Sequence, residues 1–355
     1  MYLATSSLPW RWLGIGALTV GSVLLSASAA ESDPVTSLDP LDPLVQRASH
    51  SSRVAASMLI AAVKAGERLV LAGESGIILT STDAGQSWKQ ADVPVSVTIT
   101  GLSFPSSRSG WAVGHSGVIL ATTDGGQTWV RQLDGRQLAK MLDQEGGAPQ
   151  PVVAGDPFLD VHFVDEKNGF AVGAFGLIVR TQDGGRTWLP WRSHLPNPDG
   201  NHLYGVRSVG SDLYIVGERG AIYASNDGGN RFVAVKAPYE GSLFGLTATA
   251  DQGLLVYGLR GHAFVSKDKA QSWKQIDLGT GSAWLGATVL PGGRVIMVGQ
   301  AGEVAQSVDD GASFTLLPNR QPPLTAVAAV SSEVAMAVGV RGPQRIELPA
   351  LKRGG

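Results

Sequence analysis

Six short segments place an aspartate near hydroxyl-bearing residues and, in five of the six, close to one or two glycines, a pattern that resembles part of a calcium-binding loop. An EF-hand loop needs oxygen ligands at several fixed positions, including a bidentate Glu, and these segments do not supply them. We expect a structural role instead, in which the carboxylate accepts N–H bonds in its own turn and a closing aromatic ring packs between sheets. The segments therefore predict neither a metal site nor a cofactor. Their aspartates are Asp83, Asp124, Asp183, Asp227, Asp268 and Asp309, and the tryptophans that close four of them are Trp88, Trp129, Trp188 and Trp273.

A second recurring motif, Gly-x-x-Gly, could be mistaken for a phosphate-binding loop. It occurs at 73–76, 114–117, 173–176, 217–220, 258–261, 299–302 and 339–342. A dinucleotide-binding loop needs a following helix whose N-terminus meets the phosphate, whereas an apolar strand follows here, so we expect tight turns. Arg occupies the second inner position three times, and Arg side chains suit carboxylate or protein recognition. The inner residues that predict a partner-binding face are Glu74, His115, Phe175, Glu218, Arg219, Arg260 and Arg341. Ordinary solvated turns are the open alternative.

Catalytic chemistry has weak support in the sequence. A glycosidase would need a carboxylate pair, and nothing in the spacing of Asp160, Glu218 and Glu303 singles them out. A sialidase would need three convergent arginines and a Tyr–Glu pair, but the chain has only six Tyr and no Phe-Arg-Ile-Pro motif. We expect no enzymatic activity and no catalytic residues, with a sialidase-type glycoside hydrolase or a sugar-binding propeller as the alternative. Aromatic residues that could bind a sugar, although their positions are more typical of a core, are Phe175, Tyr204, Phe244 and Trp284.

The elements that position these motifs follow from a repeat of roughly 41 residues. Each unit reads as strand, turn, strand, Gly-x-x-Gly turn, strand, aspartate segment and strand. Four short antiparallel strands at this period are typical of a propeller blade. The 46 glycines in 355 residues fit a chain with many tight turns, and the absence of Cys excludes disulfides. The sequence predicts an all-β, seven-bladed β-propeller of four-stranded antiparallel blades.

Two departures from the repeat carry further predictions. The seventh unit lacks an aspartate segment, so we expect residues 44–49 to supply its outer strand and close the ring. An insertion at about 131–156 separates the second and third segments, and Asp134 is positioned to cap a helix over 135–144. This helix carries Leu138, Met141 and Leu142 on one stripe and should lie on the same face as the arginines. A partner-binding flap and simple loop elaboration both remain open for it.

The ends of the chain predict its compartment. Arg11, an apolar run and the small residues 26–30 read as a cleavable signal peptide over 1–30, cut after Ala29 or Ala30, with an uncleaved anchor as the alternative. A leader (31–43), the propeller (44–349) and a tail (350–355) follow. The sequence thus predicts a periplasmic or secreted protein. A formal net charge of -2 gives no reason to expect nucleic-acid binding.

The residues Gly-Trp-Ala-Val-Gly-x-x-Gly-x-Ile (110–119), followed by Thr-Thr-Asp-Gly-Gly-Gln-Thr-Trp (122–129), support a family resemblance. The chain resembles, over roughly 57–345, the photosystem II stability and assembly factors of cyanobacteria and plastids, which are Asp-box (BNR-repeat) propellers. The resemblance implies a non-catalytic scaffold in the periplasm or thylakoid lumen that helps to build a membrane protein complex. It also implies an arginine-rich patch, to which Arg219, Arg260 and Arg341 would correspond. A photosystem II-like client and an envelope transporter are both open, and we expect a monomer.

Overall fold

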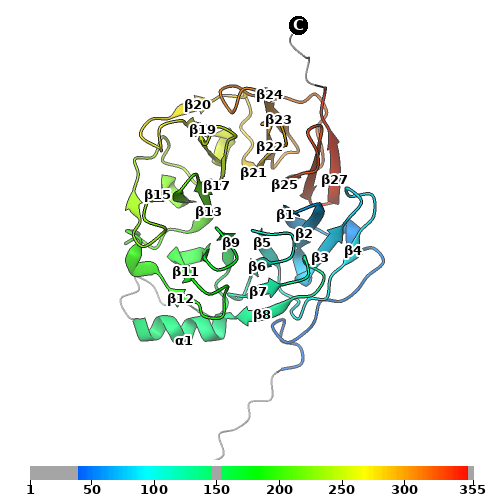
Figure 1. Cartoon of the computed structure of the whole chain (residues 1–355), viewed down its shortest axis with the longest axis vertical. Helices are drawn as coiled ribbons and strands as arrows, with labels where there is room; N and C mark the ends of the chain where they lie inside the picture. Colours follow the sequence, from blue (N-terminus) through cyan, green and yellow to red (C-terminus); the bar gives the residue numbers. More distant parts are fainter. Residues whose placement is uncertain (1–38, 146–152, 351–355) are drawn as a thin grey trace, which may run out of the picture. The chain divides into compact units, whose positions relative to one another are not determined.

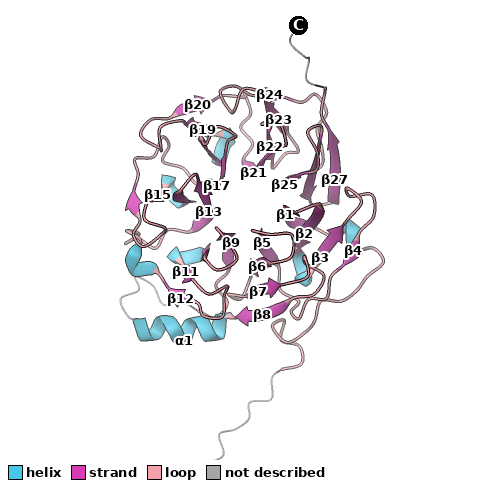
Figure 2. Ribbon diagram, in the orientation of Figure 1, coloured by secondary structure: helices cyan, strands magenta, loops and turns pink. Residues whose placement is uncertain are grey.

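The computed structural model describes residues 39–145 and 153–350. The predicted signal peptide (1–30) and nearly all of the tail lie outside the described residues. Within them, strands form seven antiparallel sheets, each ordered from its first to its last strand. The seven sheets are the blades of a ring, with the first strand of each nearest the centre (Figures 1 and 2). The predicted fold class, a seven-bladed β-propeller, is confirmed.

The first three blades share one plan of four antiparallel strands, and the outer strands of blades one and three have only two residues. Blade one contains β1 (Leu59–Ala65), β2 (Arg68–Gly73), β3 (Ile78–Ser81) and β4 (Lys89–Gln90). Blade two contains β5 (Ile99–Ser103), β6 (Gly110–Gly114), β7 (Ile119–Thr122) and β8 (Val130–Leu133). Blade three contains β9 (Phe158–Phe163), β10 (Gly169–Gly173), β11 (Ile178–Thr181) and β12 (Leu189–Pro190).

Blades four to six repeat this plan. Blade four contains β13 (Leu203–Val209), β14 (Asp212–Gly217), β15 (Ile222–Ser225) and β16 (Val233–Ala234). Blade five contains β17 (Leu243–Ala248), β18 (Leu254–Gly258), β19 (Ala263–Ser266) and β20 (Lys274–Ile276). Blade six contains β21 (Trp284–Val289), β22 (Val295–Gly299), β23 (Val304–Ser307) and β24 (Thr315–Leu316).

Blade seven has three strands instead of four, β25 (Leu324–Ala329), β26 (Val334–Gly339) and β27 (Gly342–Glu347). Short 3-10 turns also occur, namely η1 (Val54–Ala56), η2 (Glu74–Gly76), η3 (Ala174–Gly176), η4 (Arg192–His194), η5 (Glu218–Gly220) and η6 (Leu259–Gly261). The innermost strands contact one another all the way round, and β1 meets β25 to close the circle (Figure 1).

The apolar core lies between neighbouring blades. Strands such as β6 and β10 are buried along their whole length because both of their faces meet an adjacent blade. We call the six aspartate segments of the sequence, such as residues 122–129, Asp boxes. The aromatic ring that closes an Asp box packs against the blade before it, as Trp129 does in one cluster with Val70 and Ile78. Each blade therefore stabilises its neighbour, which is how a repeat that cannot bury its own faces becomes stable as a ring.

The prediction that residues 44–49 form the outer strand of blade seven is wrong. This segment forms no strand and lies beside blades one and two: the Ala48 N–H donates to the Val93 carbonyl (3.1 Å), and Arg131 Nη1 donates to the Leu44 carbonyl (2.6 Å). Burial explains the difference, since Leu44 and Ala48 enter the apolar cluster of blades one and two. The edge strand β27 carries Pro343, which cannot donate to a further strand.

The insertion contains the expected helix, α1 (Gly135–Glu145), at the rim of the ring beside β8 and β12 (Figure 2). Asp134 Oδ1 accepts the N–H groups of Arg136 (3.0 Å) and Gln137 (3.2 Å), as an N-cap should. Leu138 and Leu142 are buried between blades two and three. Neither α1 nor any other helix within 39–145 and 153–350 combines the length and apolar character needed to cross a membrane.

Candidate partner-binding face

The seven Gly-x-x-Gly turns lie on one face of the ring, which we call the turn face. In every blade the first residue inside the turn donates its N–H to the carbonyl just before the innermost strand. Glu74 donates to Met58 (3.2 Å) and Glu218 to His202 (2.9 Å) in this way. The equivalent pairs are His115–Thr98, Ala174–Pro157, Leu259–Ser242, Gln300–Ala283 and Val340–Pro323. The turns are thereby tied to the blade-to-blade connections around the mouth of the central channel.

The helix α1 begins on the same face. The Gly135 N–H donates to the Ser116 carbonyl of the blade-two turn at 2.8 Å. There is no room for a side chain on Gly117, since a Cβ there would lie 2.8 Å from Gly135 Cα. The insertion therefore starts beside the predicted partner-binding residues. This agrees with its position in the connection between blades two and three, which lies on the turn face.

The three arginines of the turn face are exposed and have no ion-pair partner within the described part of the chain. Arg219 and Arg260 occupy the second inner position of their turns with left-handed φ values of 54° and 57°, and Arg341 is in the tight β26–β27 hairpin. Their guanidinium groups make no hydrogen bond or ion pair with any residue in 39–145 or 153–350. An Arg without an internal partner keeps its full donor fork for a carboxylate or carbonyl of another molecule.

An aromatic arc runs from blade three to blade five on the same side of the ring. Phe175, which is 37% exposed, meets His202 edge-on at 4.8 Å, and Tyr204 meets Phe244 at 5.3 Å. His202 Nδ1 accepts the Phe175 N–H (2.8 Å), so this hydrogen bond fixes the imidazole ring of His202 against the blade-three turn. Burial raises the pKa of Tyr204, and the nearby charge of Glu218 adds to this effect.

Apolar side chains are interspersed with the arginines. Met58, Leu259 and Val340 are 37%, 37% and 43% exposed, and each belongs to a turn or to the connection that a turn contacts. Exposed apolar groups beside Arg are typical of the centres of protein interfaces. Sequence reasoning missed His202, Met58, Leu259 and Val340, although the inner positions of the turns already pointed to the last two.

The remaining predicted residues, Glu74, His115 and Glu218, also lie on the turn face, but they do not form one cluster. Glu74 Oε1 accepts the Met58 N–H (3.1 Å), and Glu218 Oε2 accepts the His202 N–H (3.3 Å), so both carboxylates fasten the connections. The His115 side chain is exposed on blade two. The predicted residues are therefore distributed around the mouth, with Phe175, Glu218, Arg219 and Arg260 in three successive blades.

In blades one to six an Asp box lies at the other end of the third strand, and we call that surface the box face. In blade one, Asp83 Oδ1 accepts the N–H groups of Gln86 (3.1 Å) and Ser87 (3.0 Å). The same arrangement in blade three lowers the pKa of Asp183 to about 2, mainly through the Thr187 hydroxyl. The carboxylates are thus saturated with donors from their own turns. The described ranges contain no cluster of three or more acidic or His side chains that could hold a metal ion.

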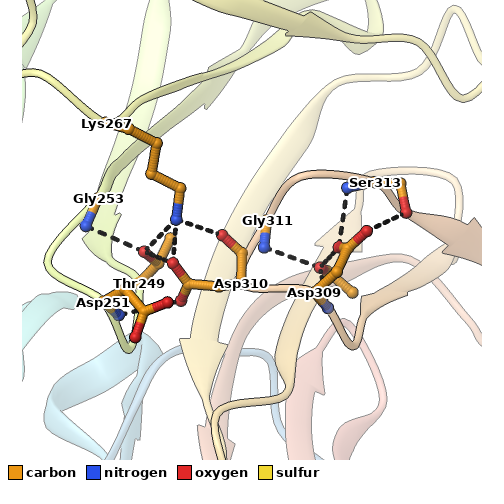
Figure 3. Close-up of polar contacts among 9 residues, drawn as sticks. Thr249, Asp251, Gly253, Lys267, Asp309, Asp310, Gly311 and Ser313 are labelled. Carbon is orange, nitrogen blue, oxygen red and sulfur yellow. Dashed lines mark hydrogen bonds and ion pairs between the residues drawn. The ribbon is translucent and has the colours of Figure 1, made fainter.

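Backbone carbonyls of the Asp boxes also accept hydrogen bonds from Lys or Arg side chains of the preceding blade. The sequence did not reveal this connection. In Figure 3, Lys267 of blade five pairs with the Asp310 carboxylate of the sixth box and donates to its carbonyl (2.7 Å). The Thr249 hydroxyl donates to the same carboxylate at 2.8 Å. Arg68 reaches the Asp124 carbonyl of the second box (2.8 Å) in the same direction. The boxes therefore link blades as well as closing their own hairpins.

The carboxylates considered for catalysis do not form a pair. Asp160 faces Arg207, Glu218 holds a connection on the turn face, and Glu303 accepts the Ala301 N–H (3.1 Å) and pairs with Arg320 (3.3 Å). These residues belong to blades three, four and six, and each has its own local partner. Trp284, proposed for sugar binding, is 1% exposed and donates from Nε1 to the Gly261 carbonyl, so it belongs to the core.

Comparison with known proteins gives independent evidence on the family of this chain. A family model described as "Photosynthesis system II assembly factor YCF48" matches residues 79–145 and 150–283. The chloroplastic photosystem II stability/assembly factor HCF136 of Oryza sativa subsp. japonica is 30% identical over 149 residues, which cover 40% of this chain and 36% of that protein. The photosystem II assembly lipoprotein Ycf48 of Synechococcus sp. (strain CC9902) is 31% identical over 120 residues, 33% of this chain and 35% of that one. The chain thus matches about a third of the length of these relatives.

Among solved structures, one titled "YCF48 bound to D1 peptide" superposes with a TM-score of 0.64 at 18% identity. The superposition covers 83% of this chain and 95% of the other. At that level of identity the similarity concerns the fold alone.

Proposed function

Because the chain belongs to the photosynthesis system II assembly factor YCF48 family, we propose that it is a non-catalytic assembly factor that binds a membrane protein through its turn face. The client is a subunit of a photosystem II-type complex. The curated relatives are named as assembly or stability factors of that complex, and one solved relative is titled as bound to a D1 peptide. These names favour a photosystem client over an envelope transporter.

The observation that carries the proposal is that Arg219, Arg260 and Arg341 have no partner among the residues that the structure describes, on a face that also exposes apolar side chains. A cation that the fold does not use contributes little to stability and is available to a partner. Phe175 and Leu259 supply apolar contacts beside these charges. A client segment that offers carboxylates or backbone carbonyls together with apolar side chains would complement both features.

The site is proposed to act by binding alone. Asp160, Glu218 and Glu303 each have a structural partner, which disfavours a glycoside hydrolase. The predicted signal peptide supports delivery to the periplasm or lumen, the side on which the chain would meet exposed segments of its client.

The proposal is tested by crosslinking the full chain in membranes of the source organism and identifying the recovered protein. We expect a photosystem II-type subunit, with recovery reduced at least fivefold when Arg219, Arg260 and Arg341 are all changed to Glu. The matched control changes Arg186, Arg231 and Lys167 to Glu, because these exposed cations belong to the box face. Equal loss in both variants, or turnover of a glycoside by the purified chain, would contradict the proposal.

A further inference from the structure

The central channel contains charged residues at positions that are otherwise small. The third residue of the innermost strand is Gly or Ala in six blades and Asp160 in blade three; the others are Ala61, Gly101, Gly205, Gly245, Gly286 and Ala326. All seven line one cavity of about 310 Å³. Small side chains keep this cavity open, so a carboxylate among them has no packing explanation.

Asp160 holds an arginine from the next blade. Its Oδ2 accepts the Val206 N–H (2.9 Å) and pairs with Nη1 of Arg207, and that nitrogen also donates to the Val206 carbonyl. The Nε and Nη2 atoms of Arg207 have no partner among the described residues. The side chain nevertheless keeps 36% of its surface accessible, and Arg207 lines the cavity. The ion pair fixes one side of the guanidinium and leaves two donors to the channel.

A tyrosine from the second layer of strands reaches the same space. Tyr257 pairs in register with Gly245, and a Cβ on that glycine would lie 2.5 Å from the phenol oxygen. The missing side chain therefore lets the ring extend to the cavity that it lines with Arg207. Burial raises the pKa of Tyr257 to about 12, so the hydroxyl stays protonated and can donate.

The mouth of the cavity is mainly apolar. The second residue of each innermost strand lies one step nearer the turn face, and five of the seven have large apolar or aromatic side chains, namely Ile60, Leu159, Tyr204, Phe244 and Leu285. All five are half-buried. A molecule entering from the turn face would pass this ring before reaching Arg207 and Tyr257.

We propose that the channel is a carboxylate-binding site, with Arg207 Nε and Nη2 and the Tyr257 hydroxyl as donors and Asp160 as the residue that positions the arginine. A guanidinium with two free neighbouring donors matches a carboxylate bidentately, and the phenol adds a third donor. The apolar mouth selects a monocarboxylate with a compact hydrophobic body. The cavity is at the lower end of the size range of small-molecule pockets. The carboxylate is carried either by a free small acid or by the last residue of a polypeptide.

Titration calorimetry of the full chain with phenylacetate tests this site. We expect a Kd of about 1 mM or tighter, and at least tenfold weaker binding of phenylacetamide, which has the same shape without the charge. Equal binding of the acid and the amide, or no binding of either, would overturn the proposal. Two five-residue peptides ending in Phe, one with a free and one with an amidated C-terminus, distinguish the sources. Tighter binding of the free peptide than of phenylacetate assigns the site to a chain end, and weaker binding assigns it to a free acid.

Two variants connect the binding to these residues. Tyr257→Phe keeps the ring and removes one donor, so we expect phenylacetate binding to weaken several-fold. The double change Asp160→Asn with Arg207→Gln removes the guanidinium without leaving a buried charge unpaired, and should abolish binding in protein whose thermal unfolding remains cooperative. Arg231→Gln on the box face is the control and should bind as the unmodified chain does. Unchanged binding in both channel variants would contradict the assignment. If the double variant does not fold, Tyr257→Phe decides alone.

Discussion

Arg345 Nη1 of β27 donates a hydrogen bond to the Ala84 carbonyl of the first Asp box at 3.0 Å, and so joins the last blade to the first. Packing reinforces this closure, because a Cβ on Gly85 of the same box would lie 2.3 Å from Met336 Cε of blade seven. The ring is therefore closed by contacts between complete blades. It does not need a strand exchanged from the N-terminus.

Replacing Arg345 with Ala should weaken this closure modestly. The guanidinium is partly exposed, so we expect a loss of about 0.5–1 kcal/mol in the free energy of unfolding, measured by urea denaturation. Arg341→Ala is the matched control, since that side chain has no partner among the described residues and should change stability by less than about 0.5 kcal/mol. Equal effects of the two substitutions would argue against a closing role for Arg345.

A glycine series in blades five and six should separate backbone strain from steric conflict. Gly261 has φ +76°, and a Cβ there would lie 1.9 Å from the Thr280 carbonyl oxygen, so Gly261→Ala should cost more than about 2 kcal/mol. Gly279 has φ +64° but open surroundings, and Gly279→Ala should cost about 1 kcal/mol. Gly281 has neither constraint, and Gly281→Ala should be nearly neutral. Urea denaturation should give this order, and any other order would show that the turn geometry has been misjudged.

The Asp boxes predict how stability depends on pH. Hydrogen bonds from the Thr187 and Ser272 hydroxyls lower the pKa values of Asp183 and Asp268 to about 2, below the usual 3.8. A carboxyl group whose pKa is lowered by folding stabilises the fold fully above its unfolded pKa, and loses that contribution as the pH falls through its folded pKa. The fold should therefore lose stability between about pH 4 and pH 2.

Thr187→Val tests this dependence, because it removes the hydroxyl donor while keeping the shape of the side chain. The variant should be less stable than the unmodified chain at neutral pH, and the difference should shrink towards about pH 2, where Asp183 becomes protonated in both. Thr187→Ser keeps a donor and should behave like the unmodified chain. A stability difference of the same size at both pH values would show that the hydroxyl does not act through the carboxylate.

The parts of the fold that repeat could be predicted from the sequence, and the parts that depend on a single position could not. The seven Gly-x-x-Gly turns predicted seven blades, because this motif marks the same hairpin every time. Residues 44–49 were misplaced, since burial of Leu44 against blades one and two leaves no trace in a local pattern. The Asp160–Arg207 pair was equally hidden, because it joins positions 47 residues apart on neighbouring blades.

In the candidate site too, the residues at repeating positions could be predicted and the others could not. The inner turn positions located the arginines on one face, because their place in the repeat determines it. His202 was missed, although it holds the Phe175 N–H at 2.8 Å, because it precedes an innermost strand and lies outside both motifs. The unpaired state of Arg219 and Arg260 is a property of the folded surroundings, which a motif does not report.

Binding of the client to the turn face can be measured as the affinity of the purified full chain for a D1 peptide, by calorimetry. Changing Arg219, Arg260 and Arg341 together to Glu should weaken binding at least tenfold, while the box-face variant with Arg186, Arg231 and Lys167 changed to Glu should bind within about twofold of the unmodified chain. Both variants should unfold cooperatively at similar temperatures. Equal affinity of the turn-face variant and the unmodified chain would contradict binding at this face.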